Sequence, residues 1–172
     1  MNIQVDTREH KEEWKRVQKQ FDAIEGVSYF RSKLYVGDYK SLDNPRLVID
    51  RKKDLQEICG NVRQQHERFK KELLKAMDAG IQIVILIEHG SDIQCLEDVI
   101  FFNQPEMTRW RWKTVEVDSK KKKVREKYQQ KAINGNTLYR SLCTIRDRYN
   151  VRFEFCEKKN TGKEIIRILE GE

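Results

Sequence analysis

The pattern of apolar and polar positions predicts five strands. Ile3–Val5 is a short apolar run, and Ile83–Ile87 is apolar at every position, which is typical of a buried central strand. β-Branched and aromatic residues predict two more strands over 29–39 and 46–51, which the turn-forming sequence SLDNP joins as a hairpin. The last predicted strand is Val151–Phe155.

Apolar residues that recur every three or four positions predict helices. Such stripes cover residues 14–26, 55–77 and 138–149, and the second contains Gly60, where we expect a kink. A last helix is predicted to begin at Thr161 with a capping box. Because these helices alternate with strands, the sequence predicts an α/β sandwich with a mixed sheet, antiparallel at the hairpin and parallel beyond it.

The predicted hairpin carries an aspartate near the outer end of each strand. If it is symmetric about Asn44, Asp38 faces Asp50 with the Cβ atoms about 4.5–5.5 Å apart. Lys52 projects from the same face, because side chains alternate along a strand. Two facing carboxylates suit a hard divalent cation such as Mg²⁺. The alternative is a surface hairpin with solvated charges.

Composition fits one compact domain over residues 1–172, since 38% of the residues are hydrophobic. The segment 91–136 is longer than an ordinary connection, so we interpret it as a basic insertion within that domain. Trp110 and Trp112 would either pack the insertion against the body or stack on exposed bases. We expect that at least one of them packs.

Positive charge is concentrated in this insertion. Residues 108–136 hold ten Lys or Arg and three acids, which equals the net charge of +7 of the whole chain. A basic block on a neutral body favours a polyanionic partner such as nucleic acid, although a solvated surface is the alternative. The candidate DNA contacts in the insertion are Arg109, Arg111, Lys120, Lys121, Lys122 and Lys123.

Other classes of protein are disfavoured. No apolar run approaches the length of a membrane span, and the first ten residues carry charges where a signal peptide is apolar, so a cytoplasmic protein is expected. The four cysteines have no CxxC spacing and the three histidines have no HxH or HExxH spacing, which argues against zinc sites.

Three ordered motifs carry a family resemblance: VDTRE at residues 5–9, GDY at 37–39 and IDRK at 49–52. Together they resemble the nuclease domain of the XPF-type structure-specific endonucleases, within the PD-(D/E)XK or restriction-endonuclease-like superfamily. The match covers residues 1–90 and resumes at Thr137. The compact form is similar to versions carried by bacteriophages and prophages. The resemblance implies a three-layer α/β/α fold around a mixed sheet.

The resemblance also implies a function. It predicts a Mg²⁺- or Mn²⁺-dependent DNA endonuclease that acts on branched DNA, such as Holliday junctions, flaps or forks, in recombination, repair or replication. Hydrolysis would leave a 5′-phosphate and a 3′-hydroxyl. Relatives often work as dimers, so a homodimer is expected. Asp38, Asp50 and the carbonyl of Arg51 would bind the metal, and Lys52 would orient or activate the attacking water.

Further residues match the family motifs less directly. Asp6 and Glu9 would complete the metal site, although acids near a helix N-terminus are the alternative. The expected phosphate contacts in the domain body are Arg8, Arg51, Lys53, Arg63 and Arg68.

The sequence also departs from the family pattern. The family most often has Glu at the position of Asp50, and it has an acid where this chain has Gln56. A shift of one residue makes Glu57 the candidate for that acid. The rival functions are a catalytically inactive nucleic-acid-binding protein and a protein whose insertion binds an acidic partner.

Overall fold

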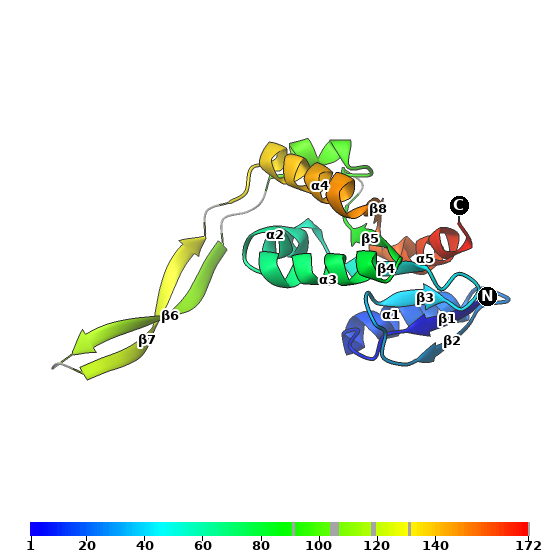
Figure 1. The fold of residues 1–172 in the computed structure, drawn as a ribbon, viewed down its shortest axis with the longest axis horizontal. Helices are drawn as coiled ribbons and strands as arrows, with labels where there is room; N and C mark the ends of the chain where they lie inside the picture. Colours follow the sequence, from blue (N-terminus) through cyan, green and yellow to red (C-terminus); the bar gives the residue numbers. More distant parts are fainter. Residues whose placement is uncertain (91, 104–106, 118–119, 131, 172) are drawn as a thin grey trace.

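The computed structural model describes residues 1–90, 92–103, 107–117, 120–130 and 132–171 (Figure 1). Six strands form one mixed sheet in the order β2-β1-β3-β4-β5-β8. These strands are β1 (Asn2–Val5), β2 (Ser28–Arg31), β3 (Tyr39–Ser41), β4 (Leu47–Lys52), β5 (Gln82–Glu88) and β8 (Arg152–Cys156). β3 and β4 are antiparallel, whereas β4, β5 and β8 run parallel, as the sequence predicted.

The prediction of a single strand over 29–39 is wrong. The segment divides into β2, which pairs in parallel with β1, and a connection that leads to β3 on the other side of β1. Gly37 makes the entry into β3 possible, because its φ is +68° and a Cβ there would lie 2.2 Å from Cγ1 of Val48. A strand cannot continue through that conformation.

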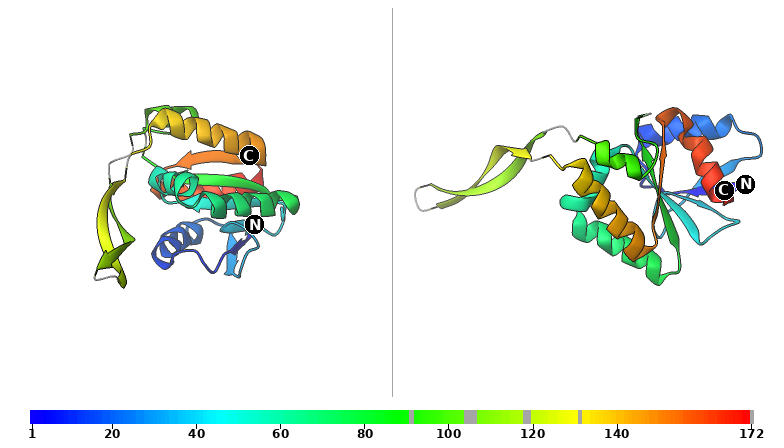
Figure 2. Two further views of the ribbon diagram at one scale, coloured as in Figure 1. Left: turned by 60° about the vertical axis from the view of Figure 1, so that its left-hand side comes forward. Right: turned by 90° about the horizontal axis from the view of Figure 1, so that it is seen from above.

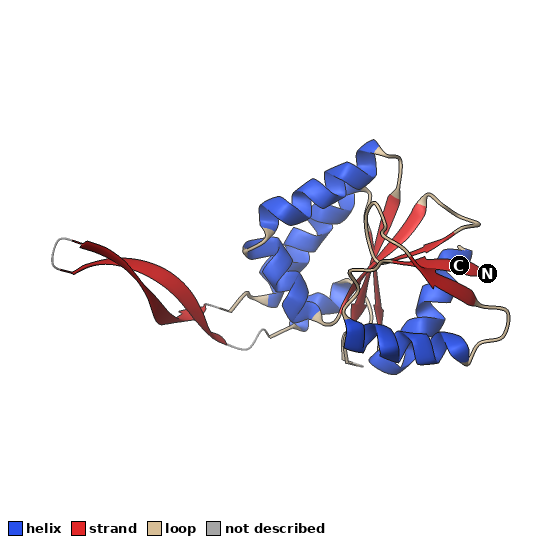
Figure 3. Ribbon diagram, turned by 90° about the horizontal axis from the view of Figure 1, so that it is seen from below, coloured by secondary structure: helices blue, strands red, loops and turns tan. Residues whose placement is uncertain are grey.

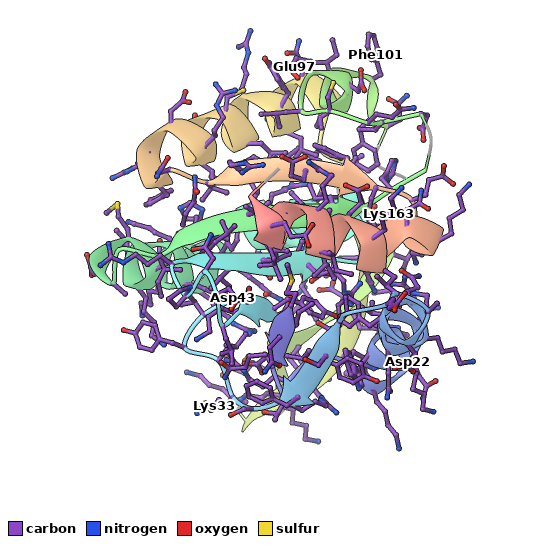
Figure 4. The ribbon with its side chains drawn as sticks, turned by 90° about the vertical axis from the view of Figure 1, so that its right-hand side faces the viewer. Asp22, Lys33, Asp43, Glu97, Phe101 and Lys163 are labelled. Atoms are coloured by element: carbon purple, nitrogen blue, oxygen red, sulfur yellow. The ribbon has the colours of Figure 1, made fainter. Side chains whose placement is uncertain are left out.

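Helices cover both faces of the sheet (Figure 2). Helices α1 (Lys11–Asp22) and α5 (Thr161–Glu170) lie on one face, and α2 (Leu55–Arg63), α3 (His66–Asp78), α4 (Gly135–Tyr149) and the 3₁₀ helix η1 (Glu97–Phe101) lie on the other. Asp22 and Phe101 mark the two layers in Figure 4. Ile83, Ile85 and Ile87 of β5 pack toward the second layer. Val84 and Leu86 pack toward the first.

Two details of the predicted helices differ. The helix expected over 55–77 is broken into α2 and α3, and the break lies at Gln64 and Gln65, whose N–H groups both bond to the carbonyl of Gly60. The capping box at Thr161 is wrong, because Asn160 is the N-cap residue and makes no side-chain cap. The Thr161 hydroxyl donates instead to Glu88 Oε1, at 2.7 Å.

The basic segment forms an antiparallel β-ribbon of β6 (Met107–Val117) and β7 (Lys120–Gln130), which we call the hairpin. It projects away from the body (Figures 1 and 3). The expectation that a tryptophan packs on the body is wrong: Trp110 is 53% exposed and Trp112 is 68% exposed. In the described residues, β6 and β7 pair only with each other, so the hairpin offers these rings no apolar layer.

Residues before the hairpin belong to the body. Ile93, Leu96, Val99 and Phe102 are buried, and they pack with α4 in the core on the second face. No helix in the described ranges combines the length and the apolarity that crossing a bilayer requires.

Candidate active site

The turn between β3 and β4 brings Asp38 and Asp50 to the same place. Tyr39 pairs with Ile49 in the ladder of β3 and β4, and Asp38 and Asp50 come directly after this pair on the two sides. The backbone N–H of Asp38 donates to the carbonyl of Ile49 at 2.8 Å, which holds Asp38 beside the end of the ladder. The register is that of a hairpin symmetric about Asn44.

Lys52 joins the two aspartates. Its Nζ lies 2.7 Å from Oδ1 of Asp50, and both residues are more than nine-tenths buried. Oδ2 of Asp38 accepts a hydrogen bond of 2.8 Å from the backbone N–H of Arg51. Two carboxylates and one ammonium therefore meet at the carboxyl end of β4.

The electrostatics of this group favour an additional cation. Burial raises the pKa of Asp38 well above its usual range, and the charges of Asp50 and Glu9 raise it further. Burial alone would lower the pKa of Lys52, but Asp50 and Asp38 outweigh it, so the pKa of Lys52 is raised. Lys52 therefore stays protonated at neutral pH, and its single positive charge faces two carboxyl groups.

A buried ion-pair network lies behind these residues. Nη2 of Arg51 is 2.6 Å from Oε1 of Glu9, and Nη1 is 3.1 Å from Oε2 of Glu88. Arg16 also pairs with Glu88, whose Oε1 accepts a hydrogen bond from the hydroxyl of Thr161. The guanidinium of Arg51 is thus paired with two buried carboxylates, and its side chain is only 5% exposed.

Glu88 and Arg16 were not predicted from the sequence. Glu88 ends an otherwise apolar strand, IVILIE, and a charge at the end of a buried strand is the one local signal that marks it.

Burial raises the pKa of Glu9, because the effect of Arg51 does not fully compensate for desolvation.

Asp6 has a different environment from the one expected. It is fully buried and its carboxylate accepts hydrogen bonds from the backbone and side chain of Arg8 and from the backbone of Leu34. Burial would raise the pKa of Asp6, but these hydrogen bonds outweigh it and the pKa is lowered. Asp6 therefore positions Arg8 at the cleft and is not itself part of the cleft lining.

The aspartates open into a cleft of about 520 Å³. Many predicted site residues line it: Arg8, Glu9, Asp38, Asp50, Arg51, Lys52, Lys53, Glu57 and Arg68. Asp6 and Arg63 are not in the lining. The cleft also includes His10, Glu13 and Glu72, which the sequence did not single out.

Glu57 lies at the start of α2 within this lining. Its Oε2 accepts a hydrogen bond of 3.1 Å from the backbone N–H of Lys53. Asp54 caps the helix, because its side chain accepts a hydrogen bond of 2.8 Å from the backbone N–H of Glu57. This reciprocal cap fixes the chain directly after Lys52. Glu57 therefore supports the geometry of the segment that carries Asp50 and Lys52.

The oxygen donors of the cleft decide whether it can hold a metal. No group of three or more His, Cys, Asp or Glu in the described part of the chain is placed to hold one. Asp38 and Asp50 nevertheless provide two converging carboxylates, and the negative charges of Asp50 and Glu9 act against ionisation of Asp38. Mg²⁺ is commonly bound by one or two carboxylates, with waters and substrate phosphates completing its six positions. The residues present fit that mode of binding.

The predicted basic contacts of the hairpin lie apart from the cleft. Arg111, Lys121, Lys122 and Lys123 are exposed on β6 and β7. The side chains of Arg109 and Lys120 lie outside the described part of the structure, although their backbones belong to these strands.

No protein-family model matches the chain, and no curated protein matches it. Among solved structures it is similar to XPF from Aeropyrum pernix, with 14% identity and a TM-score of 0.59 over 99% of this chain and 64% of that chain. It is equally similar to XPF from Aeropyrum pernix in complex with DNA, with 15% identity and a TM-score of 0.59 over 98% of this chain and 63% of that one. The chain spans less than two thirds of both. It has an XPF-like, restriction-endonuclease-like fold.

Proposed function

We propose that the protein is a metal-dependent DNA endonuclease. The observation that carries the proposal is the pair of opposed carboxylates, Asp38 and Asp50, held with the ammonium of Lys52 in a cleft at the end of β4. Such a group serves no packing purpose, because burying two like charges costs free energy that a bound cation recovers. The XPF-like nuclease fold supports the same conclusion.

Asp38 and Asp50 would hold Mg²⁺ or Mn²⁺, and we expect the carbonyl of Arg51 to contribute. When bound, the ion would supply a Lewis acid for the phosphoryl group and lower the pKa of a water. Asp38 is kept in orientation by its bond from the Arg51 backbone, and Asp50 by its pair with Lys52.

Lys52 would act as a cation. Its raised pKa keeps the ammonium protonated, so it donates a hydrogen bond to a phosphate oxygen or to the attacking water and does not serve as the base. Arg8, Lys53 and Arg68 at the cleft would contact flanking phosphates. Arg51 has a structural task, which is to hold Glu9 and Glu88 behind the site.

The substrate we propose is branched DNA, and its processing would belong to recombination, repair or replication. The hairpin supports this proposal, because its basic strands project beyond the body of the protein and would reach a second segment of DNA. We propose in addition that the protein works as a homodimer.

The test is a panel of end-labelled linear, flap, fork and four-way DNAs, each incubated with Mg²⁺, with Mn²⁺ or with EDTA. Metal-dependent cuts in the branched substrates, absent in an Asp50→Asn variant, are expected. Salt-sensitive DNA binding without any cleavage would instead identify an inactive nucleic-acid-binding protein. Absence of DNA binding at low salt would favour a protein partner for the hairpin.

A further inference from the structure

The two faces of the hairpin carry different chemistry. In the register of β6 and β7, Trp110 lies opposite Lys127 and Trp112 lies opposite Arg125. Because side chains alternate along each strand, these four residues share one face, which we call the tryptophan face. Lys121 and Lys123 belong to the same face by the same alternation.

Cations of the tryptophan face lie against its rings. The guanidinium carbon of Arg125 is 5.3 Å from the ring centroid of Trp110 and 5.9 Å from that of Trp112. Nζ of Lys127 is 5.2 Å from the ring of Trp110. These cation–π contacts restrict the indoles while leaving most of their area in solvent, so the rings are ordered before any ligand arrives.

The opposite face is also basic, because Arg111, Lys113 and Lys122 stand against the single acid Glu126 among its described side chains. On that face, Oε2 of Glu126 accepts a hydrogen bond of 3.0 Å from Nε of Arg111, and its Oε1 lies 3.6 Å from Nζ of Lys113. The tryptophan face carries Lys121, Lys123, Arg125 and Lys127 with Glu116 as its one acid among the described side chains. Both faces are therefore basic, and the exposed indoles of Trp110 and Trp112 are what distinguishes the tryptophan face.

We propose that the tryptophan face binds unpaired nucleobases of DNA, a site that rests on the proposed function. Trp110 and Trp112 stack on base faces, while Arg125 and Lys127 contact the adjoining phosphates. Duplex DNA hides the faces of its bases, so a hairpin that needed only duplex phosphates would use lysines without exposed indoles. The ligand is the single-stranded part of a flap, fork or junction.

The position of the hairpin fits this ligand. β4 and β5 run parallel, and Lys52 pairs with Ile87, so the carboxyl ends of both strands lie together at the end of the sheet that carries the candidate site. The chain that leads to the hairpin leaves β5 at this end of the sheet. Lys53, which follows β4, and Gly90, which follows β5, line the same pocket there. The hairpin projects away from the body, so an unpaired strand held there would lead away from a duplex held in the cleft.

The test is equilibrium binding in EDTA with Asp50→Asn as the parent, which removes cleavage from the measurement. Probes are an oligo-dT strand, a flap and a linear duplex, followed by anisotropy and by quenching of indole fluorescence. Trp110→Ala with Trp112→Ala should weaken binding of oligo-dT and flap by about 10- to 100-fold. Duplex affinity should change by less than about threefold, because the phosphate contacts persist.

Two further variants make the result specific. Tyr128→Ala removes the aromatic side chain of the opposite face, which contacts Arg111, and should leave all three affinities unchanged. Trp110→Phe with Trp112→Phe keeps stacking and strand propensity, and should restore most of the affinity. This variant separates the effect of stacking from disruption of the ribbon itself.

Equal weakening for oligo-dT and duplex, or an equal effect of Tyr128→Ala, would overturn the inference. Neither outcome touches the proposed function, whose failure would be an absence of metal-dependent cleavage by the wild-type protein. Conversely, selective binding of oligo-dT by a protein that never cleaves would retain this site and reject the nuclease.

Discussion

The cleft region and the hairpin both contain arginine–glutamate ion pairs, but these pairs are buried near the cleft and exposed on the hairpin. In the cleft region, Arg51 is paired with Glu9 and Glu88, and its side chain is 5% exposed. On the hairpin, Arg111 is paired with Glu126, and its side chain is 57% exposed. Water screens the second pair and not the first, so only the first strongly constrains the structure around it.

Tryptophan shows the same difference. Trp14 on α1 is buried, and its ring packs edge-on against Tyr29 with centroids 5.3 Å apart. Trp112 is largely exposed and faces Arg125 of its own hairpin. A residue type therefore does not identify a role: Trp14 stabilises the body, whereas Trp112 is available to a ligand.

The largest expected effect concerns the cleft. Asp50→Asn should lower the rate of Mg²⁺-dependent DNA cleavage by about 10⁴-fold, equivalent to about 5.5 kcal/mol of activation free energy, because the proposed mechanism loses a metal ligand. DNA affinity should be equal or higher, since a charge that repels phosphate is removed. The measurement is single-turnover cleavage of a labelled branched DNA.

The matched control for this variant is Asp43→Asn in the exposed turn between β3 and β4, and this control should cut at the wild-type rate. Wild-type cleavage by Asp50→Asn would disprove the assignment of the site.

The next largest effect tests burial directly. Arg51→Met should lower the free energy of unfolding by about 3–5 kcal/mol, because Glu9 and Glu88 are left buried without their partner. Arg111→Met should change it by less than about 1 kcal/mol. Urea unfolding measures both. Similar decreases for the two variants would contradict the contrast between buried and exposed pairs.

A smaller effect concerns the hairpin. Changing Lys120, Lys121, Lys122 and Lys123 to Ala should weaken binding to DNA of any sequence. The slope of log affinity against log salt should fall by about 0.9 for each duplex phosphate that the protein no longer neutralises. Cleavage at saturating protein should not change, because lysines on the DNA backbone take no part in the chemistry. Titrations at several salt concentrations measure the slope.

The control for the lysine tract removes four exposed lysines of the body instead, Lys15, Lys19, Lys33 and Lys163, two of which are marked in Figure 4. An equal decrease of slope in this control would mean that net charge, and not the hairpin, drives binding. A reduced rate at saturating protein in the tract variant would mean that the hairpin helps to shape the active site.

The smallest effect concerns Asp38. Its raised pKa means that the folded protein binds this proton more tightly than the unfolded chain, so stability falls as pH rises from the usual carboxyl range toward the raised pKa. Asp38→Asn removes this decline. In metal-free buffer at pH 7 it should raise the melting temperature by about 2–4 °C, the shift that about 1 kcal/mol produces in a domain of this size.

The gain from Asp38→Asn should shrink at pH 4 and disappear when Mg²⁺ is added to the wild-type protein, since both relieve the same repulsion. Calorimetry at the two pH values gives the comparison. An unchanged or lower melting temperature at pH 7 would argue against repulsion between Asp38 and Asp50.

Local pattern was sufficient for the centre of the site. Asp50 and Lys52 lie on β4, and Asp38 directly precedes β3, so all three belong to one short unit of the chain. The register of such a unit depends on the turn and on the alternation of side chains, both of which are visible in the sequence. The layered α/β fold was predictable for the same reason, because helical and strand periodicity are local properties.

Contacts between distant segments were decided by the tertiary structure. The network of Glu9, Arg51, Glu88 and Arg16 joins β4, β5, α1 and the loop before α1, and no spacing in the chain records that meeting. The break between β2 and β3 has the same origin, because β2 is held by its parallel pairing with β1. Exposure of Trp110 and Trp112 depends on where the hairpin lies relative to the body, and burial is a property of the folded surface that strand periodicity alone does not contain.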